Sequence, residues 1–156
     1  QNNLNDSGYN LVVIDGSVSG STSAGGLNRA EWSLSETDIN LMILGLGAND
    51  MLRGISPIET EKNLEKIIKI AKKKKIEVIL AGMIAPTTYG YSYKKSFDDI
   101  YPNLAKKYDL NLIPFLLEGV ALKPKFNQDD GMHPNEKGTL ILSDIVKKSI
   151  INFIKK

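Results

Sequence analysis

Residues 41–50 read Leu-Met-Ile-Leu-Gly-Leu-Gly-Ala-Asn-Asp, an apolar run followed by a loop of glycine and polar residues. The run Leu41–Leu44 contains no polar residue, which is typical of a parallel strand that is covered on both faces. Similar short runs occur at Leu11–Ile14, Glu77–Leu80 and Leu112–Phe115. The sequence therefore predicts four strands of a parallel sheet.

Helical patterns separate these runs. The longest is Pro57–Lys74, which has Ser56 as its N-cap, proline at its first position and apolar residues at helical spacing. Strands that alternate with helices predict a single domain over residues 1–156, folded as a three-layer α/β/α sandwich with a parallel sheet. The other expected helices are Gly26–Leu34, Tyr93–Tyr108, Glu136–Ile154 with Asn135 as its cap, and a last turn at Gln1–Asp6 that Ser7-Gly8 ends.

Composition excludes several classes of protein. The chain has 20 basic and 18 acidic residues, and its one basic run, Lys72–Lys75, ends a helical pattern, where cations are favourable. A nucleic-acid partner is therefore not expected.

The lack of cysteine excludes disulfides, thiolate metal sites and a cysteine nucleophile. No apolar run is long enough to cross a membrane. A phosphate-binding loop and a dinucleotide fingerprint are both absent, and we expect no metal or organic cofactor.

The only histidine of the chain, His133, lies in Asp129–Asn135, which reads Asp-Asp-Gly-Met-His-Pro-Asn. Asp130 precedes it by three positions on a loop broken by Gly131, so the carboxylate can reach the imidazole and fix which ring nitrogen carries the proton. Pro134 favours extended backbone at the histidine. This arrangement predicts the general base and the orienting carboxylate of a hydrolytic triad.

Two other loops follow predicted strands, at the carboxyl ends where parallel sheets bind ligands. Residues Asp15–Gly26 are rich in Gly and Ser, so the loop either presents a backbone N–H to an oxyanion or simply caps the next helix. In Gly45–Asp50, Asn49 either donates its side-chain amide to an oxyanion or forms a turn with Asp50. Together with Asp130 and His133, these donors suit acyl transfer.

These residues resemble the SGNH hydrolases, also called the GDSL lipase/esterase family, and are most similar to its branch of bacterial thioesterase I, lysophospholipase and arylesterase enzymes. Val18-Ser19-Gly20 with Thr22 resembles the second block of the family, which implies that the Gly20 N–H lines the oxyanion hole. Gly47-Ala48-Asn49-Asp50 resembles the third block, which implies that Asn49 is the side-chain donor. Asp130-Gly131-Met132-His133 resembles the fifth block. The resemblance covers essentially the whole chain and implies a flavodoxin-like fold.

The first block of the family, Gly-Asp-Ser-Leu, carries the nucleophilic serine and does not occur in this chain. In the family it would precede Gln1, together with a strand and most of a helix, which amounts to about 30 residues. We expect that an N-terminal segment of the same protein supplies this block. A natural pseudo-hydrolase is an alternative. Another is that a serine of the loop Asp15–Gly26 replaces the nucleophile, namely Ser17, Ser19, Ser21 or Ser23.

The resemblance implies a serine hydrolase that cleaves carboxylic esters or thioesters, such as acyl-CoA, lysophospholipids or short-chain and aryl esters, through an acyl-enzyme. A catalytically inactive flavodoxin-like module that binds a small molecule or lipid is the alternative. A signal peptide in the preceding segment would place the protein in the periplasm or outside the cell, and its absence would place it in the cytoplasm. Five residues are candidates for the substrate groove, with ordinary loop packing as the alternative: Met51, Leu52, Pro86, Tyr89 and Phe126.

Overall fold

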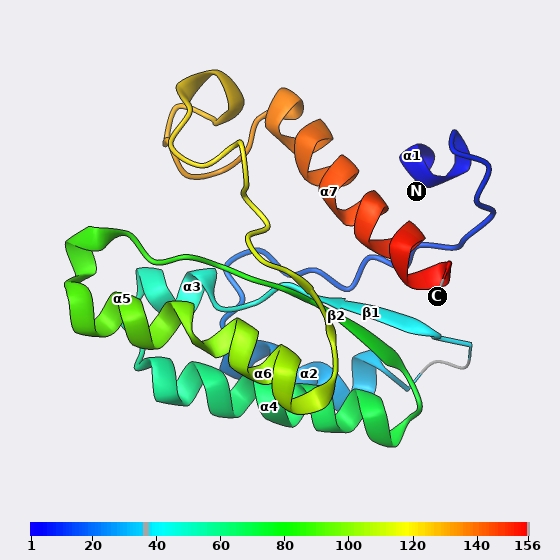
Figure 1. The fold of residues 1–156 in the computed structure, drawn as a ribbon, viewed down its shortest axis with the longest axis horizontal. Coiled ribbons are helices and arrows are strands. Elements are labelled where there is room, and N and C mark those ends of the chain that lie inside the picture. The colour runs from blue at the N-terminus through cyan, green and yellow to red at the C-terminus, as the bar shows by residue number, and fades with distance from the viewer. Residues whose placement is uncertain (36–37, 156) are drawn as a thin grey trace. The chain divides into compact units, whose positions relative to one another are not determined.

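The computed structural model describes residues 1–35 and 38–155 of the chain (Figure 1). The chain forms two compact units. The sheet unit comprises Gly16–Pro114, and the terminal unit comprises Gln1–Asp15 together with Phe115–Lys156.

The sheet unit contains three parallel strands in the order β1-β2-β3. These are β1 (Leu41–Leu44), β2 (Glu77–Ala81) and β3 (Asn111–Ile113). Strand β1 has its predicted bounds, and β2 is one residue longer than predicted. Strand β3 begins one residue early and ends before Pro114, which has no backbone N–H for a ladder. Three of the four predicted strands are therefore confirmed.

The prediction of a strand at Leu11–Ile14 is wrong for the described chain, where these residues have no regular structure. A strand needs a neighbour to accept and donate its backbone hydrogen bonds, and the terminal unit has no described strand to do so. The side chain of Gln1 is the hydrogen-bond partner instead of a strand, because its Oε1 accepts from the Val13 N–H at 2.7 Å. Val12 is 87% exposed. Apolar content alone does not make a strand.

Helices of the sheet unit lie on one face of the sheet, as Figure 1 shows for α2, α4, α5 and α6. The contact between α4 and β2 forms the core, where Leu64, Ile68, Ile79 and Leu80 are fully buried. Each such side chain contributes about 1.5–3 kcal/mol by leaving water. The bounds are α2 (Ser23–Ser33), α3 (Ala48–Leu52), α4 (Pro57–Lys73), η1 (Thr87–Tyr89), α5 (Tyr91–Asp98) and α6 (Ile100–Tyr108).

The helix predicted at Tyr93–Tyr108 is wrong as one element, because it breaks into α5 and α6 at Asp99. Pro102 has no N–H to donate to the carbonyl of Asp98, which is the bond that would continue α5. The prediction at Gly26–Leu34 is confirmed as a helix, but α2 begins earlier, at Ser23. Its N-cap is Thr22, whose Oγ1 accepts from the Gly25 N–H at 3.2 Å.

In the terminal unit, α1 (Asn2–Asn5) packs against α7 (Glu136–Ile154), and η2 (Pro124–Phe126) also contacts α7. Asn3 joins the two helices, since its side chain donates to Asp144 at 2.9 Å and accepts from Lys147 at 2.6 Å. Helix α7 has its predicted bounds, and Asn135 caps it by accepting from the Gly138 N–H at 3.1 Å. None of the described helices is both long and apolar enough to span a membrane.

Gly82 provides a test of this sheet. It follows β2, and a Cβ there would lie 2.3 Å from the carbonyl oxygen of Pro114 and 3.0 Å from that of Ile113. We expect Gly82→Ala to lower the free energy of unfolding by about 1–3 kcal/mol, because both obstacles are backbone. Urea unfolding measures the change.

The matched control is Gly16→Ala, because a Cβ at Gly16 meets no atom within 4 Å. That variant should unfold at a urea concentration equal to or slightly above that of the wild type. Equal stability of the two variants would contradict the close approach of β2 to Pro114.

Candidate active site

Asp130 and His133 form a hydrogen-bonded pair on one loop of the terminal unit. Asp130 Oδ2 lies 2.6 Å from His133 Nδ1, while Oδ1 accepts from the backbone N–H groups of Met132 and His133, both at 2.9 Å. The imidazole side chain is 65% exposed. The carboxylate therefore engages Nδ1 and leaves Nε2, on the opposite side of the ring, available to another group.

Backbone contacts hold this loop in its shape. The His133 carbonyl accepts from the Gln128 N–H at 2.7 Å, and the Gln128 carbonyl accepts from the Gly131 N–H at 2.9 Å. Gly131 has φ of +69°, a left-handed conformation that favours glycine. Buried Asn127 fixes the preceding turn by donating to the carbonyls of Val120 and Lys123, both at 2.8 Å. No local pattern in the sequence indicates this role of Asn127.

The pKa of Asp130 is lowered to about 2. The main cause is the backbone N–H of His133, followed by the His133 side chain and the N–H of Met132, all of which stabilise the charged form. The carboxylate is therefore ionised under ordinary conditions and can accept a hydrogen bond from a protonated Nδ1.

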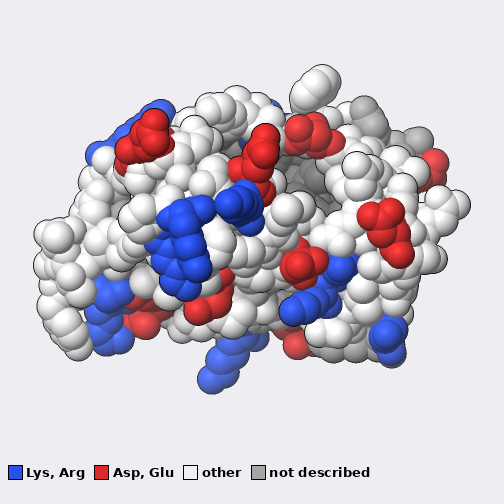
Figure 2. All heavy atoms as spheres, turned by 90° about the horizontal axis from the view of Figure 1, so that it is seen from above, with Lys and Arg blue, Asp and Glu red and all other residues white. Residues whose placement is uncertain are grey.

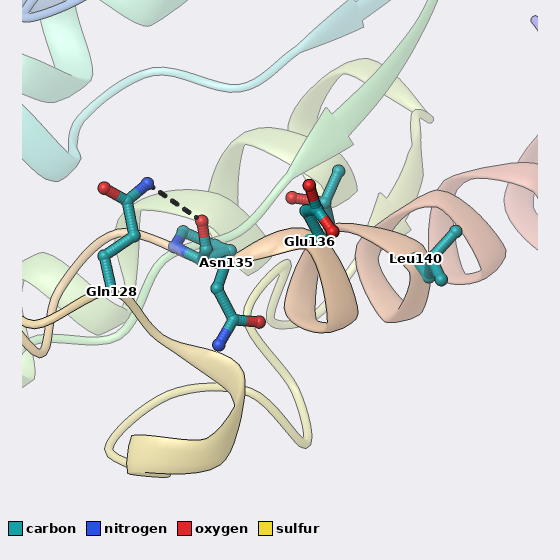
Figure 3. A pocket seen from close by; sticks show the side chains of 6 residues that line it. Gln128, Asn135, Glu136 and Leu140 are labelled. Carbon is teal, nitrogen blue, oxygen red and sulfur yellow. Dashed lines mark hydrogen bonds between the residues drawn. The ribbon is translucent and has the colours of Figure 1, made fainter.

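A surface hollow of about 730 Å³ lies beside this loop (Figure 3). Gln128 spans part of it, since its Nε2 donates to the Pro134 carbonyl at 3.1 Å. The sequence did not single out this hollow. The residues that line it are Gln128, Pro134, Asn135, Glu136, Thr139 and Leu140.

In the sheet unit, Gly20 occupies a tight turn in which the Ser21 N–H donates to the Val18 carbonyl at 3.1 Å. Its φ of +71° lies in the left-handed region, which favours glycine at the third position of such a turn. Arg53 donates to the Gly20 carbonyl at 2.9 Å. Within the described residues, no backbone carbonyl accepts from the Gly20 N–H.

Asn49 lies in the first turn of α3 and donates through Nδ2 to the carbonyl of Ser21 at 3.2 Å. The structure therefore brings the second and third blocks together. The amide nitrogen carries two hydrogens, and Ser21 uses one of them. Asn49 and Gly20 together offer two neutral donors of the kind that an oxyanion hole requires.

Behind Asn49 lies a buried polar cluster that the sequence analysis missed. Asp50 is fully buried, and its carboxyl group accepts from the Ser23 N–H at 2.7 Å, from the Ser23 hydroxyl and from the Thr60 hydroxyl at 3.2 Å. Asn63 donates to the Ser23 hydroxyl at 3.0 Å. The sequence suggested only that Asp50 forms a turn, because its partners lie 27 and 10 residues away.

Four of the five groove candidates lie in the sheet unit. Met51 and Leu52 end α3, Pro86 precedes η1, and Tyr89 lies in η1. Leu52 is 49% exposed and Met51 is half-buried. The fifth, Phe126, is a half-buried residue of the terminal unit, with Lys125 Nζ 4.7 Å from its ring centre.

Stacked aromatic side chains connect these loops to the core of the sheet unit. Tyr89 stacks on Tyr93 at 5.3 Å, Tyr93 on Phe97 at 6.0 Å, and Phe97 meets Tyr101 edge-on at 5.8 Å. Tyr93 donates to the Ile55 carbonyl at 2.9 Å and Tyr101 to that of Leu46 at 3.0 Å. Burial, then the charge of Asp50, raises the pKa of Tyr101. These two bonds fix both ends of the segment that contains Asn49.

The sequence model of the GDSL-like lipase/acylhydrolase family matches residues 1–140. The chain belongs to the GDSL-like lipase/acylhydrolase family. The membership predicted from the three motifs is therefore confirmed.

Similar proteins include thioesterase 1/protease 1/lysophospholipase L1 of Escherichia coli (strain K12), which is 39% identical over 138 residues. That match covers 88% of this chain and 66% of the E. coli protein, slightly less than two thirds of its length. The arylesterase of Vibrio mimicus is 36% identical over 151 residues, which cover 97% of this chain and 76% of the arylesterase.

Among solved structures, the psychrotrophic esterase EstA from Pseudoalteromonas sp., inhibited by monoethylphosphonate, superposes with a TM-score of 0.93 at 27% identity. The superposition covers 99% of this chain and 85% of the esterase. This likeness confirms the predicted flavodoxin-like α/β fold class.

Titration of Asp130 tests the geometry of the loop. The hydrogen bonds to its carboxylate are at full strength above its unfolded pKa, near 4, and are lost as the pH falls through about 2. We expect the carboxyl carbon of Asp130 to titrate near pH 2 in an NMR experiment on the purified protein, so that the pair persists at all higher pH values where the protein is folded.

His133→Ala is the informative variant, because it removes one of the three donors to Asp130 and keeps both backbone N–H groups. Its Asp130 midpoint should move upward but stay below the ordinary value. A midpoint near 4 in the unsubstituted protein would contradict the arrangement.

Proposed function

We propose that the protein containing this chain is a serine hydrolase that cleaves carboxylic esters or thioesters through an acyl-enzyme. The observation that carries this proposal is the Asp130–His133 pair, with a carboxylate 2.6 Å from Nδ1 and an exposed imidazole. An ionised carboxylate at Nδ1 fixes the tautomer in which Nε2 is the basic nitrogen, as general-base catalysis requires.

In the proposed reaction a serine hydroxyl attacks the carbonyl carbon while His133 Nε2 takes its proton. The tetrahedral oxyanion accepts hydrogen bonds from the Gly20 N–H and from the Asn49 amide. The bond from the carbonyl carbon to the alcohol or thiol then breaks, and His133 protonates the leaving group. Water attacks the acyl-serine with His133 again as base, which releases the acid and restores the serine. Asp130 holds the imidazole and stabilises its protonated form.

The nucleophile of this proposal is a serine in a further segment of the same protein, since no Gly-Asp-Ser sequence occurs in residues 1–156. The names of the relatives support the reaction class, because they describe a thioesterase and lysophospholipase and an arylesterase. The esterase of similar fold is inhibited by monoethylphosphonate. A phosphonate is tetrahedral and anionic like the intermediate of ester hydrolysis, which is why such compounds bind hydrolases.

The substrate of the proposal is an ester or thioester with an apolar acyl group, in the range of acyl-CoA, lysophospholipids and short-chain or aryl esters. Met51, Leu52, Pro86, Tyr89 and Phe126 are the proposed walls of its binding groove. A nucleic acid is a poor alternative as the ligand, because basic and acidic side chains are interspersed on the face shown in Figure 2. The run Lys72–Lys75 ends α4, where Lys74 Nζ lies 3.6 Å from Glu31.

A fluorophosphonate probe tests where the nucleophile lies. We expect intact-mass and peptide mass spectrometry of the full-length gene product to find one probe per protein, on a serine outside residues 1–156. A probe on Ser17, Ser19, Ser21 or Ser23 would instead assign the nucleophile to the loop of Gly20. A folded protein that takes up no probe would contradict the hydrolase and favour the alternative module that binds a small molecule or lipid.

The roles of His133 and Asn49 are tested by steady-state hydrolysis of p-nitrophenyl esters by the full-length protein. His133→Gln should abolish turnover, because a glutamine amide is not basic and cannot take the proton of the serine hydroxyl. Asn49→Ala should lower kcat by about 10²–10³-fold with little change in KM, the usual effect of losing one oxyanion donor. Retained turnover in the His133 variant would refute the assignment of the base.

A further inference from the structure

Three bridges connect the turn at residues 20–23 to the segment at residues 49–53. They are the bonds of Arg53 to the Gly20 carbonyl at 2.9 Å, of Asn49 to the Ser21 carbonyl at 3.2 Å, and of the Ser23 N–H to Asp50 at 2.7 Å. Both proposed oxyanion donors therefore lie in the part of the sheet unit that these bridges hold together.

The bridges differ in burial. Arg53 is exposed and the bond of Asn49 is only part-buried, so water competes for both. Asp50 and Ser23 are fully buried, and the carboxyl group accepts three hydrogen bonds from Ser23 and Thr60. Hydrogen bonds to a carboxylate away from water are stronger and shorter than neutral, exposed ones. The Asp50–Ser23 bridge is thus the firm one.

The cluster is satisfied without a cation. In the described part of the chain, no Lys or Arg forms an ion pair with Asp50. A buried carboxylate is costly to desolvate, and it stays in place only where its donors are fixed. Ser23 is fixed as the first residue of α2 and also accepts from Asn63 at 3.0 Å, while Thr60 belongs to α4.

Resting on the proposed function, we infer that Asp50 is a positioning residue for the oxyanion hole. It anchors α3 to the start of α2, which sets Asn49 beside Ser21 so that one amide hydrogen is held and the other is aimed at the position of the oxyanion. Donors must lie within about 2.7–3.1 Å of the developing charge. A small shift of α3 therefore reduces the stabilisation of the transition state more than it reduces the binding of the substrate.

A double-mutant cycle in the full-length protein tests this inference. Asp50→Asn keeps the shape of the side chain but replaces one accepting oxygen by an NH₂ group. We expect kcat to fall about 10–100-fold with KM changed less than about twofold, because Asp50 acts through a transition-state donor. In an Asn49→Ala background the same substitution should lower kcat little further, because the donor that Asp50 positions is already absent.

Glu65→Gln is the matched control, since it exchanges a carboxylate for an amide in α4 and disturbs Lys107 and Tyr108 rather than Asn49. Its kcat per folded molecule should equal that of the wild type. If Asp50→Asn lowers kcat by the same factor with and without Asn49, Asp50 is merely structural and the inference is overturned.

Ser23→Ala covers the case in which Asp50→Asn does not fold. It removes the hydroxyl donor and keeps the Ser23 N–H on Asp50, so the anchor is loosened rather than lost. A smaller fall in kcat is expected, which should again disappear when Asn49 is alanine. An unchanged kcat in Ser23→Ala, or a fall that persists without Asn49, would contradict the inference.

A readout without turnover separates this inference from the proposed function. If the wild type hydrolyses no ester, the proposed function fails, and the side-chain amide of Asn49 is then followed by ¹H–¹⁵N NMR. Positioning by Asp50 predicts two well-separated amide proton signals in the wild type and their convergence in Asp50→Asn or Ser23→Ala. Identical amide signals in all three proteins would overturn the inference.

Discussion

The parallel pairing of β1 with β2 is the constraint on which the sheet unit depends. Its register runs from Leu41 opposite Glu77 to Leu44 opposite Leu80, and it fixes where the chain leaves the sheet. Three residues later Gly47 turns the chain into α3 with φ of +114°. A side chain there would clash with the Tyr101 hydroxyl, because a Cβ would lie 2.2 Å from it. Asn49 therefore occupies its place through strand pairing and one close approach of backbone to an aromatic ring.

The two parts of the proposed site are built in different ways. Asp130 and His133 are three residues apart and form their pair within one exposed loop, so they depend little on the rest of the fold. Gly20 and Asn49 are distant in sequence, and hydrogen bonds that involve α2, α3 and α4 connect the segments that contain them. An exposed pair contributes little to stability, whereas the buried cluster around Asp50 is able to hold a fixed geometry. Local sequence thus determines the position of the base, and tertiary structure determines the positions of the oxyanion donors.

The limits of prediction from the sequence follow the same division. The strand at Leu41–Leu44, the cap at Asn135 and the spacing of Asp130 and His133 are local patterns, and the structure contains all three features. Leu11–Ile14 has the apolar content of a strand but no described neighbour, and Pro102 divides a helix whose apolar pattern is continuous. The partners of Asp50 lie in α2 and α4, so no local pattern indicates that its carboxyl group is buried.

The most direct test of the proposed mechanism is a crystal structure of the full-length protein after reaction with a phosphonate inhibitor. We expect phosphorus bonded to a serine Oγ near His133 Nε2, with one phosphonate oxygen within hydrogen-bond distance of both the Gly20 N–H and the Asn49 amide. A phosphonate oxygen that contacts neither donor, or a phosphonate bound to a residue that is not near His133, would contradict it.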